Sequence, residues 1–378
     1  MQKRAKHIKG LKRIVVKIGS SSLTAHEGFL DIGNMKKFCR EIKEAVGRKL
    51  QVIVVSSGAI AAGLQKLGIG GRPEDISMLQ AAASVGQVEL MRIYSNIFAD
   101  EGIKVGQILL TQEDTTSREQ YLNIRSTIET LLGMGIVPVI NENDSVAVDE
   151  IKFGDNDILA ALVASLTDSD LLVILTDIEG LYEKDPKIDP QAKVIKIVDE
   201  ITEGIEEISG GAGSLYGLGG MASKVRAAKV CHFSGIGLAV ANSREERVLA
   251  RIIDGEDIGT FFVPQKGKKV KSLKRWIAFG MRAKGSIVID EGAKKAIIEK
   301  GKSILPVGVV DAEGSFNPGD TLKVYSLDGE LIAKGISNFS DKEVRSIKGK
   351  NEKQLSEEIG GGLCKEIIHR DCLVVFKS

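Results

Sequence analysis

The chain has 378 residues, a length that suggests two or three domains at about 150 residues each. Hydrophobic residues make up 43% of the chain and charged residues 27%, so collagen, a disordered tail and a low-complexity scaffold are excluded. There are 52 lysines and arginines against 51 aspartates and glutamates. This balance gives no overall attraction to nucleic acid or to an anionic membrane.

The sequence contains no apolar run of about 18 residues, the length that a membrane span needs. Residues 1–13 are basic but lack the apolar stretch of a secretory signal, so we interpret them as a solvated overhang. The cysteines, Cys39, Cys231, Cys364 and Cys372, form no C-x-x-C pair, which is typical of reduced thiols. We therefore predict a cytoplasmic protein with no membrane partner.

In the first two-thirds of the chain, short apolar runs alternate with longer amphipathic stretches. Because these runs are apolar along their whole length, we expect an α/β fold with a mostly parallel sheet covered by helices on both faces. Ligands of such sheets bind beyond the carboxyl ends of the strands. The pattern predicts strands at 14–18, 52–55, 105–110, 137–140 and 171–175, helices at 34–47 and 158–166, and a helix that opens at 56–59.

The pattern changes after Phe262. No acidic residue occurs between Ile258 and Ile289, where lysines and arginines accumulate, and we interpret part of this stretch as a linker. Beyond it, turn signals separate short β-like runs, which predict a small β-rich domain with one early helix near 293–299. The expected divisions are a catalytic domain at 1–265, a basic linker at 266–283, a small domain at 284–361 and a C-terminal strand and tail at 362–378.

Two strand ends carry groups that suit anions. Lys17 lies near the end of the first predicted strand and is followed by Gly19, so an ammonium group and close backbone N–H groups are available; the alternative is a lysine that extends from a sheet edge to water. Ser57, Gly58 and Ala59 open a helix. Its N–H groups can donate to a carboxylate or phosphate, although a plain N-cap serine is the alternative.

Acids and amides gather in two further windows, 141–144 and 155–157. N-capping of the helix at 158–166 explains one of them, but not all. The others suit Mg²⁺, the orientation of lysines, or capture of a substrate ammonium group. The residues that we single out are Asn141, Asp144, Asp155, Asn156 and Asp157.

A fourth pair of segments suggests a phosphate site. Thr176 and Asp177 follow a predicted strand, and the glycine-rich stretch 217–220 precedes a helix that carries Lys224. The spacing is not that of a P-loop, and no strand is followed by the dinucleotide pattern G-x-G-x-x-G. A flexible loop joined to a surface helix is the alternative interpretation.

Taken together, these segments resemble the amino acid kinase family, and most closely its members that phosphorylate glutamate and carry a C-terminal PUA domain. The order and spacing of the motifs make the resemblance specific. The motifs are Val-Lys-Ile-Gly-Ser at 16–20, Ser-Ser-Gly-Ala-Ile-Ala-Ala-Gly at 56–63, Val-Pro-Val-Ile-Asn-Glu-Asn-Asp at 137–144, Gly-Asp-Asn-Asp at 154–157, Leu-Thr-Asp at 175–177, Gly-Leu-Tyr at 180–182 and Gly-Gly-Met-Ala-Ser-Lys at 219–224, with PUA-like segments at 290–293 and 303–308.

The resemblance implies transfer of a phosphoryl group from ATP, with Mg²⁺, to the γ-carboxylate of L-glutamate, which opens proline biosynthesis. It implies that Lys17 and Lys224 neutralise the transferring phosphoryl group and that Asp157 orients both lysines. Ser57, Gly58, Ala59, Asn141, Asp144, Asp155 and Asn156 are then expected at the glutamate site, with Asp144 facing the α-ammonium group. Lys17, Thr176, Asp177, Leu218, Gly219, Gly220, Met221, Ala222, Ser223 and Lys224 are expected at the ATP site.

One position departs from the family pattern, because Leu218 stands where family members often carry threonine. A hydroxyl contact to the nucleotide is therefore missing there, or the backbone serves instead. The resemblance also implies a homo-oligomer, a dimer or tetramer, and feedback inhibition by proline. The Mg²⁺ ligands stay unassigned, since nucleotide phosphates and water can hold the ion.

Two alternatives stay open at this stage. One is a kinase of the same fold that acts on N-acetylglutamate, aspartate, carbamate or UMP. The other is an RNA-binding protein that acts through the PUA domain and the basic stretch 258–289, which we do not expect to be the main role because the net charge is only +1.

Overall fold

The computed structural model describes residues 2–24, 29–111, 113–115, 117–147, 156–186, 188–210, 220–265, 272–351, 354 and 366–376. Internal contacts divide the chain into two compact units. The first unit comprises Met1–Asp114 and Arg118–Lys269, and the second comprises Thr115–Ser117 and Val270–Ser378.

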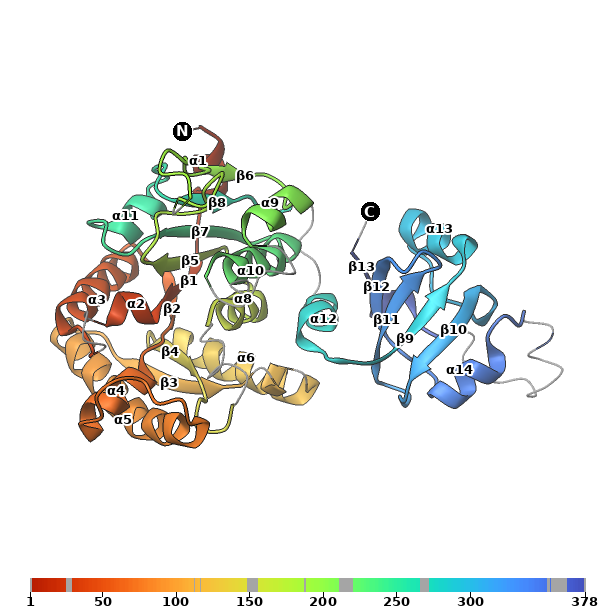
Figure 1. Ribbon diagram of the computed structural model, residues 1–378, viewed down its shortest axis with the longest axis horizontal. Coiled ribbons are helices and arrows are strands. Elements are labelled where there is room, and N and C mark those ends of the chain that lie inside the picture. Colours follow the sequence, from red (N-terminus) through yellow and green to blue (C-terminus); the bar gives the residue numbers. More distant parts are fainter. Residues whose placement is uncertain are drawn as a thin grey trace. The chain divides into compact units, whose positions relative to one another are not determined.

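An eight-stranded sheet, counted over the described part of the chain, forms the centre of the first unit (Figure 1), in the order β3-β4-β2-β1-β5-β7-β8-β6. All neighbours in it are parallel except β7 and β8. This confirms the α/β fold that the continuous apolar runs predict. The strands are β1 Arg13–Ile18, β2 Gln51–Val55, β3 Val105–Leu110, β4 Val137–Glu142, β5 Leu171–Thr176, β6 Ile197–Val198, β7 Gly237–Asn242 and β8 Thr260–Phe262.

Helices cover both faces of this sheet (Figure 1). On one face, Ile14 and Val16 of β1 join a buried core with Met35 and Phe38 of α3. Because side chains alternate along a strand, Lys17 lies on the other face, where α8 and α10 pack. The helices are α1 Gln2–Ile8, α2 Ser20–Leu23, α3 Ile32–Gly47, α4 Ala59–Leu67, α5 Ile76–Asp100, α6 Arg118–Gly133, α8 Asn156–Leu166, α9 Glu203–Ile208, α10 Met221–Ser234 and α11 Val248–Ile253; a 3-10 turn, η1, covers Glu113–Thr115.

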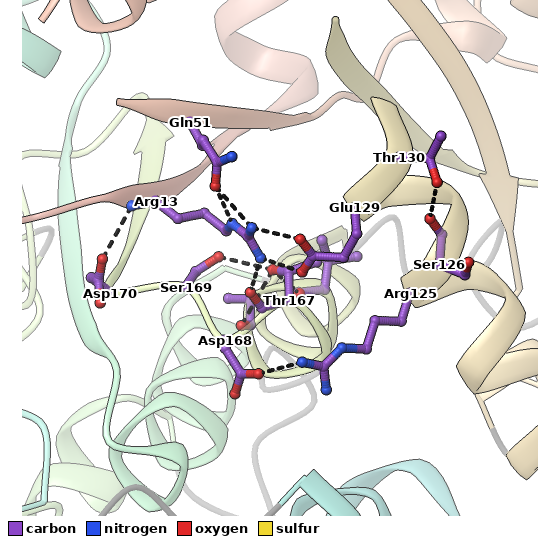
Figure 2. A network of polar contacts seen from close by, with 12 residues as sticks. Arg13, Gln51, Arg125, Ser126, Glu129, Thr130, Thr167, Asp168, Ser169 and Asp170 are labelled. Atoms are coloured by element: carbon purple, nitrogen blue, oxygen red, sulfur yellow. Dashed lines mark hydrogen bonds and ion pairs between the residues drawn. The ribbon is translucent and has the colours of Figure 1, made fainter. Parts of the chain in front are cut away.

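The amino end of β1 is held by a network around Arg13 (Figure 2). Arg13 donates from Nη1 and Nη2 to the two carboxylate oxygens of Glu129 on α6, at 2.5 and 2.7 Å, and from Nε to Gln51 Oε1 at 3.0 Å. Its Nη1 also donates to the carbonyl oxygen of Thr167, which directly follows α8. Two strands and two helices are therefore tied together at the end of the sheet where β1 begins.

Two helices, α4 and α5, pack unusually closely through glycines. A β-carbon added at Gly63 would lie 1.8 Å from the carbonyl oxygen of Ala82, and one added at Gly86 would lie 1.8 Å from that of Ala59. Only glycine permits this separation of the two backbones. The contact holds α5 against the helix that opens at the end of β2.

The N-terminal segment is not the solvated overhang that its charge suggested. Arg4 of α1 is only 1% exposed, donates from Nη1 to the carbonyl oxygen of Ile258 at 2.6 Å, and lies over the ring of Phe261. Burial lowers its pKa to about 10, against the charge of Asp257, which raises it. The guanidinium can be buried because the ring face and a carbonyl oxygen replace part of its hydration.

The second unit contains a five-stranded sheet in the order β10-β9-β11-β12-β13, among the residues described for it. Ile287, Leu322, Val324 and Ile332 form its core together with Ile297 of α13. The elements are α12 Ser272–Arg275, a π-helical turn η2 Trp276–Gly280, β9 Ala283–Ile289, α13 Glu291–Lys300, η3 Pro306–Gly308, β10 Val309–Gly314, β11 Thr321–Ser326, β12 Leu331–Ile336, α14 Asp341–Ile347, η4 Arg370–Cys372 and β13 Leu373–Val375.

Residues 272–283, which the run of basic charges placed in a linker, are folded in the structure. They contain α12, η2 and the start of β9, and Trp276 and Ile277 are buried. The apolar side chains between the lysines and arginines account for this packing.

The described residues contain no helix that is long and apolar enough to cross a membrane.

Candidate active site

The site residues lie at the carboxyl ends of the central strands. β1 lies between β2 and β5 in the sheet, with β4 beyond β2. Polar groups from β2 and β4 therefore lie on one side of Lys17, and those that follow β5 lie on the other. A boundary of this kind in a parallel sheet is where ligands bind.

Asp157 joins two lysines that are 207 residues apart in the chain, Lys17 and Lys224. Lys17 Nζ lies 2.7 Å from Asp157 Oδ1, and Lys224 Nζ lies 3.0 Å from Asp157 Oδ2. The lysine side chains are each 7% exposed and that of Asp157 is 1% exposed. The two ammonium groups thus meet on one buried carboxylate.

The charge state of Asp157 follows from these contacts. Burial by itself raises the pKa of this carboxyl group, but the charges and hydrogen bonds of Lys17 and Lys224 outweigh burial and hold the pKa well below its usual range. Asp157 is therefore ionised at neutral pH. The buried group of two ammonium ions and one carboxylate carries a net positive charge, which suits a phosphate.

The first turn of α10 presents Lys224 together with backbone groups. Gly220 precedes this helix in a conformation with φ 82° and ψ −129°, which favours glycine. Its carbonyl oxygen accepts hydrogen bonds from Ser223 Oγ at 2.8 Å and Lys224 Nζ at 3.2 Å. Ser223 Oγ also lies 2.8 Å from Asp157 Oδ2. Met221 and Ala222 are half-buried in the same turn.

Thr176 and Asp177 lie at the end of β5, next to β1 in the sheet. Thr176 is buried and its Oγ1 donates to Asp177 Oδ1 at 3.1 Å, while Asp177 is exposed. The backbone carbonyl oxygen of Thr176 accepts from the N–H group of Ser243, which follows β7. These residues lie on the side of β1 where the sheet continues to β7 and β8.

A cavity of about 350 Å³ opens on the other side, beside β2 and β4. The N-terminus of α4 and the strand ends form its polar wall. Its apolar wall includes Phe29, Ile60, Leu64 and Ile69. The predicted residues that line it are Ser57, Gly58, Ala59, Asn141, Asp144 and Asn156.

A chain of side-chain amides supports this polar wall. Asn156 Nδ2 donates to Ser57 Oγ at 3.0 Å, to the carbonyl oxygen of Ser56 at 2.6 Å and to Asn141 Oδ1 at 2.9 Å. Asn141 Nδ2 in turn donates to Gln87 Oε1 at 2.8 Å. The strand ends are thus joined to one another and to helix α5.

Asp144 is an ionisable group of this polar wall whose pKa differs clearly from the usual value of an aspartate. Burial raises the pKa of its carboxyl group to about 6, although the nearby charge of Arg72 lowers it. Arg72 also lines the cavity. A substrate ammonium group next to Asp144 would favour the ionised form and be held by it.

The structure therefore brings most of the predicted residues together around Lys17. Asp155, Leu218 and Gly219 lie outside the described residues, so their placement stays a prediction.

Sequence reasoning missed Gln87 and Tyr94 on α5. Tyr94 is fully buried with its hydroxyl 2.9 Å from Ser56 Oγ. Their spacing of seven residues places both on one face of the helix, but neither follows a strand, which was the feature that we searched for.

Metal ligands are not assigned by the structure. Within the described ranges, no three His, Cys, Asp or Glu side chains lie close enough together to hold a metal ion. Asp157, the most buried carboxylate of the site, is already paired with two lysines. These described side chains therefore do not form a protein cage for Mg²⁺.

Over most of its length the chain is similar to known proteins. The model of the amino acid kinase family matches residues 12–242 and that of the PUA domain matches residues 285–359. Glutamate 5-kinase from Caldanaerobacter subterraneus subsp. tengcongensis is 47% identical over 97% of this chain and 98% of its own. The enzyme of that name from Syntrophotalea carbinolica is 45% identical over the same shares. Among solved structures, UMP kinase from Bacillus anthracis aligns over 69% of this chain and 99% of its own, with a TM-score of 0.46 and 15% identity.

The family model covers more than half of the chain, so the protein is a kinase of the amino acid kinase family. In its parallel sheet, two lysines meet on one buried aspartate. Within this family, relatives that align over nearly the whole length are named glutamate 5-kinase, and this chain also matches the PUA domain at 285–359. The chain belongs to the glutamate 5-kinase family.

Proposed function

We propose that this protein transfers the γ-phosphoryl group of ATP to the γ-carboxylate of L-glutamate, giving L-glutamyl 5-phosphate and ADP, the step that opens proline biosynthesis. One observation carries the proposal. Asp157 holds the ammonium groups of Lys17 and Lys224 at 2.7 and 3.0 Å, and the residue before it, Asn156, lines a cavity whose polar wall suits an α-amino acid.

In this proposal, glutamate binds in the cavity beside β2 and β4. Asp144 faces the α-ammonium group, and the N–H groups at the start of α4 with Ser57 donate to carboxylate oxygens. Asn141 and Asn156 complete the polar wall. ATP binds across β1, against Thr176, Asp177 and the turn that starts α10, and the resemblance extends this site to Leu218 and Gly219.

Phosphoryl transfer needs positioning and charge neutralisation more than covalent help from the protein. The γ-carboxylate, with a reference pKa of about 4.3, is already ionised at neutral pH, so no general base is required. One of its oxygens forms a bond to the γ-phosphorus while the bond from that phosphorus to the β–γ bridging oxygen breaks, and ADP leaves with the electron pair. Lys17 and Lys224 stabilise the charge on the transferring oxygens, and Asp157 fixes the two lysines in place.

Mg²⁺ enters this proposal with the nucleotide, since phosphate oxygens and water can supply its ligands. The ion contributes neutralisation of phosphate charge. The contribution of the chain is to hold the two lysines near the γ-phosphate, and this does not depend on a protein ligand to the metal.

Trapping of the acyl phosphate with hydroxylamine tests the proposal directly. Purified protein, ATP and MgCl₂ are incubated with glutamate, N-acetylglutamate or aspartate, and the hydroxamate is measured; ADP release is measured with carbamate and UMP. We expect glutamate to be strongly preferred. Preference for N-acetylglutamate, which has no ammonium group for Asp144, would contradict the assignment, as would ADP release only with UMP.

Four further features belong to the same proposal. We propose that the protein acts in the cytoplasm, assembles as a dimer or tetramer and is inhibited by proline. We also retain the division into a kinase domain at 1–265 and a PUA domain at 284–361 followed by a C-terminal strand and tail at 362–378. Gel filtration and proline titration of the hydroxamate assay test the assembly and the inhibition.

A further inference from the structure

We propose that Gln87 is a positioning residue for glutamate, acting through Asn141 and Asn156 to present a buried oxygen to the substrate ammonium group. This inference rests on the proposed function. Gln87 lies in the middle of helix α5 rather than directly after a strand, and its side chain is only partly exposed. Its one described hydrogen bond connects it to Asn141.

The orientation of Asn141 is fixed by the backbone. The N–H group of Glu142 donates to Asn141 Oδ1 at 3.0 Å, and a backbone N–H group can only donate. The oxygen of Asn141 therefore faces that N–H group, and its Nδ2 must face Gln87. Gln87 Oε1, at 2.8 Å, is the acceptor that this nitrogen requires.

The orientation of Asn156 follows in the same way. The carbonyl oxygen of Ser56 lies 2.6 Å from Asn156 Nδ2, and a carbonyl oxygen can only accept. The nitrogen of Asn156 also meets Asn141 Oδ1 and Ser57 Oγ, so its protons are consumed by protein acceptors. A reversed amide would place its oxygen against two other acceptors and is excluded.

This arrangement leaves Asn156 Oδ1 as a free acceptor. The atom is buried and meets no hydrogen-bond donor within the part of the chain that the structure describes. A buried polar atom without a partner is costly, and Asn156 lines the cavity that also contains Asp144. A ligand with a donor, such as the ammonium group of an α-amino acid, can satisfy the atom while pairing with Asp144.

Gln87 reaches Asn141 because of the close packing of α4 and α5. Gly86, the residue before it, packs against the backbone of Ala59 so tightly that a β-carbon would lie 1.8 Å from the carbonyl oxygen there. This contact brings α5 close to the strand ends. Loss of the Gln87 acceptor would leave Asn141 Nδ2 buried without a partner. A shift of the Asn141 side chain that gives this nitrogen another partner would move Oδ1 away from Asn156 and loosen the position of the Asn156 amide.

The test compares Gln87→Met, which removes the acceptor at similar length, with Gln87→Glu, which keeps an acceptor oxygen. We expect Gln87→Met to raise the KM for glutamate about tenfold, as the loss of one hydrogen bond to a charged group predicts, with kcat and the KM for ATP unchanged. Gln87→Glu restores the KM for glutamate. Gln107→Met is the matched control. Exposed Gln107 lines a second cavity, distinct from the proposed glutamate cavity, together with Gln87, and it takes no part in the chain of amides, so we expect all constants to stay unchanged.

Glutarate, which lacks the ammonium group, separates positioning from general damage. We expect its KM to be the same in the wild type and in Gln87→Met. An unchanged KM for glutamate in Gln87→Met overturns the inference, as does an equal rise for glutarate or for ATP. If Gln87→Met does not fold, Gln87→Glu provides the test. A raised KM for glutamate in Gln87→Glu would overturn the role of the acceptor oxygen. Failure of the wild type to form hydroxamate from glutamate overturns the proposed function instead.

Discussion

Lys224 lies in the first turn of α10 with its ammonium group 3.0 Å from Asp157 Oδ2. Because Lys17 keeps Asp157 paired, Lys224→Ala removes a positive charge from the site without leaving the carboxylate alone. We expect kcat to fall by about 100-fold or more, as for the loss of one group that stabilises charge in a transition state, with little change in the KM for glutamate. Hydroxamate formation under saturating substrates measures this.

Lys229 on the same helix provides the control for that variant. Its side chain is 43% exposed and pairs with Glu206 at 2.6 Å, away from Asp157. Lys229→Ala should keep the wild-type kcat. Near-normal turnover in Lys224→Ala would show that the second ammonium group has no part in the transfer.

Asp144 gives the site a pH dependence whose sign follows from its contacts. Burial raises the pKa of this carboxyl group to about 6, with Arg72 lowering it, and only the ionised form attracts the substrate ammonium group. The ratio kcat/KM for glutamate, which reports the free enzyme, should therefore fall by about tenfold for each pH unit below about 6. Above pH 7, kcat/KM for glutamate should not change with pH.

The variant Asp144→Asn tests whether the fall of kcat/KM below about pH 6 is due to Asp144. We expect a KM for glutamate raised by about 10- to 100-fold, as for the loss of a charged hydrogen-bond partner, with the KM for ATP unchanged and the fall below about pH 6 absent. If kcat/KM for glutamate still falls below about pH 6 in Asp144→Asn, the group that titrates is not Asp144. Equal rises in both KM values contradict a role in glutamate binding.

At the scale of elements, the contact between α4 and α5 supports both the fold and the site. Gly86→Ala places a β-carbon 1.8 Å from the carbonyl oxygen of Ala59, so the helices must separate. We expect a loss of about 1–3 kcal/mol in the free energy of unfolding, typical of overpacking, and a raised KM for glutamate. Gly133→Ala, at the end of α6 where an added β-carbon meets nothing, should be neutral or stabilising in urea unfolding.

The Arg13 network at the other end of β1 affects stability rather than catalysis (Figure 2). Glu129→Gln keeps the hydrogen bonding of its oxygen but removes the charge that faces Arg13 at 2.5 Å. Since Glu129 is 39% exposed, we expect a loss of only about 1 kcal/mol and an unchanged kcat. Glu89→Gln removes the charge that faces Arg92 on α5, whose side chain is 59% exposed against 14% for Arg13, so it should cost less in the same urea titration. A fall of kcat in Glu129→Gln would contradict a purely structural role of the Arg13 network.

The elements that the sequence predicts best are those whose apolar pattern is continuous. The strand at 105–110 is observed at Val105–Leu110, and the helix expected at 34–47 begins two residues earlier, where Asp31 caps it by accepting from the N–H group of Asn34 at 3.0 Å. In β10, in contrast, Val309 and Ala312 are buried, while Val310 and Asp311 between them are exposed. Its irregular register against β9 hides the alternation that identifies a strand.

The site was predictable to the extent that its residues follow strands. The positions of Lys17, Asn141 and Thr176 follow from a parallel sheet, because its carboxyl ends meet at one edge. The support from α5 was not predictable, since Gln87 and Tyr94 reach the strand ends only through the packing of Gly86 against another helix. Residue types and spacing identify chemical groups, but the buried partners that orient them depend on tertiary contacts.

At the scale of the whole molecule, the two units have separate apolar cores, one around Ile14, Val16 and Phe38 and the other around Ile287 and Leu322. All described residues that we place in the active site belong to the first unit. A unit with its own core can fold independently. We therefore expect a chain that ends at residue 265 to form hydroxamate with the same KM values for glutamate and ATP as the full chain.

The measurement compares the two chains at equal concentration of folded protein, determined by circular dichroism, so that a loss of stability is not mistaken for a loss of catalysis. If the truncated chain is folded but its KM for glutamate rises, the second unit contributes to the glutamate site. If only kcat falls, the second unit instead affects the closure or assembly of the first. Equal constants would confine the chemistry to the parallel sheet and leave the PUA domain with a separate role, such as regulation or assembly.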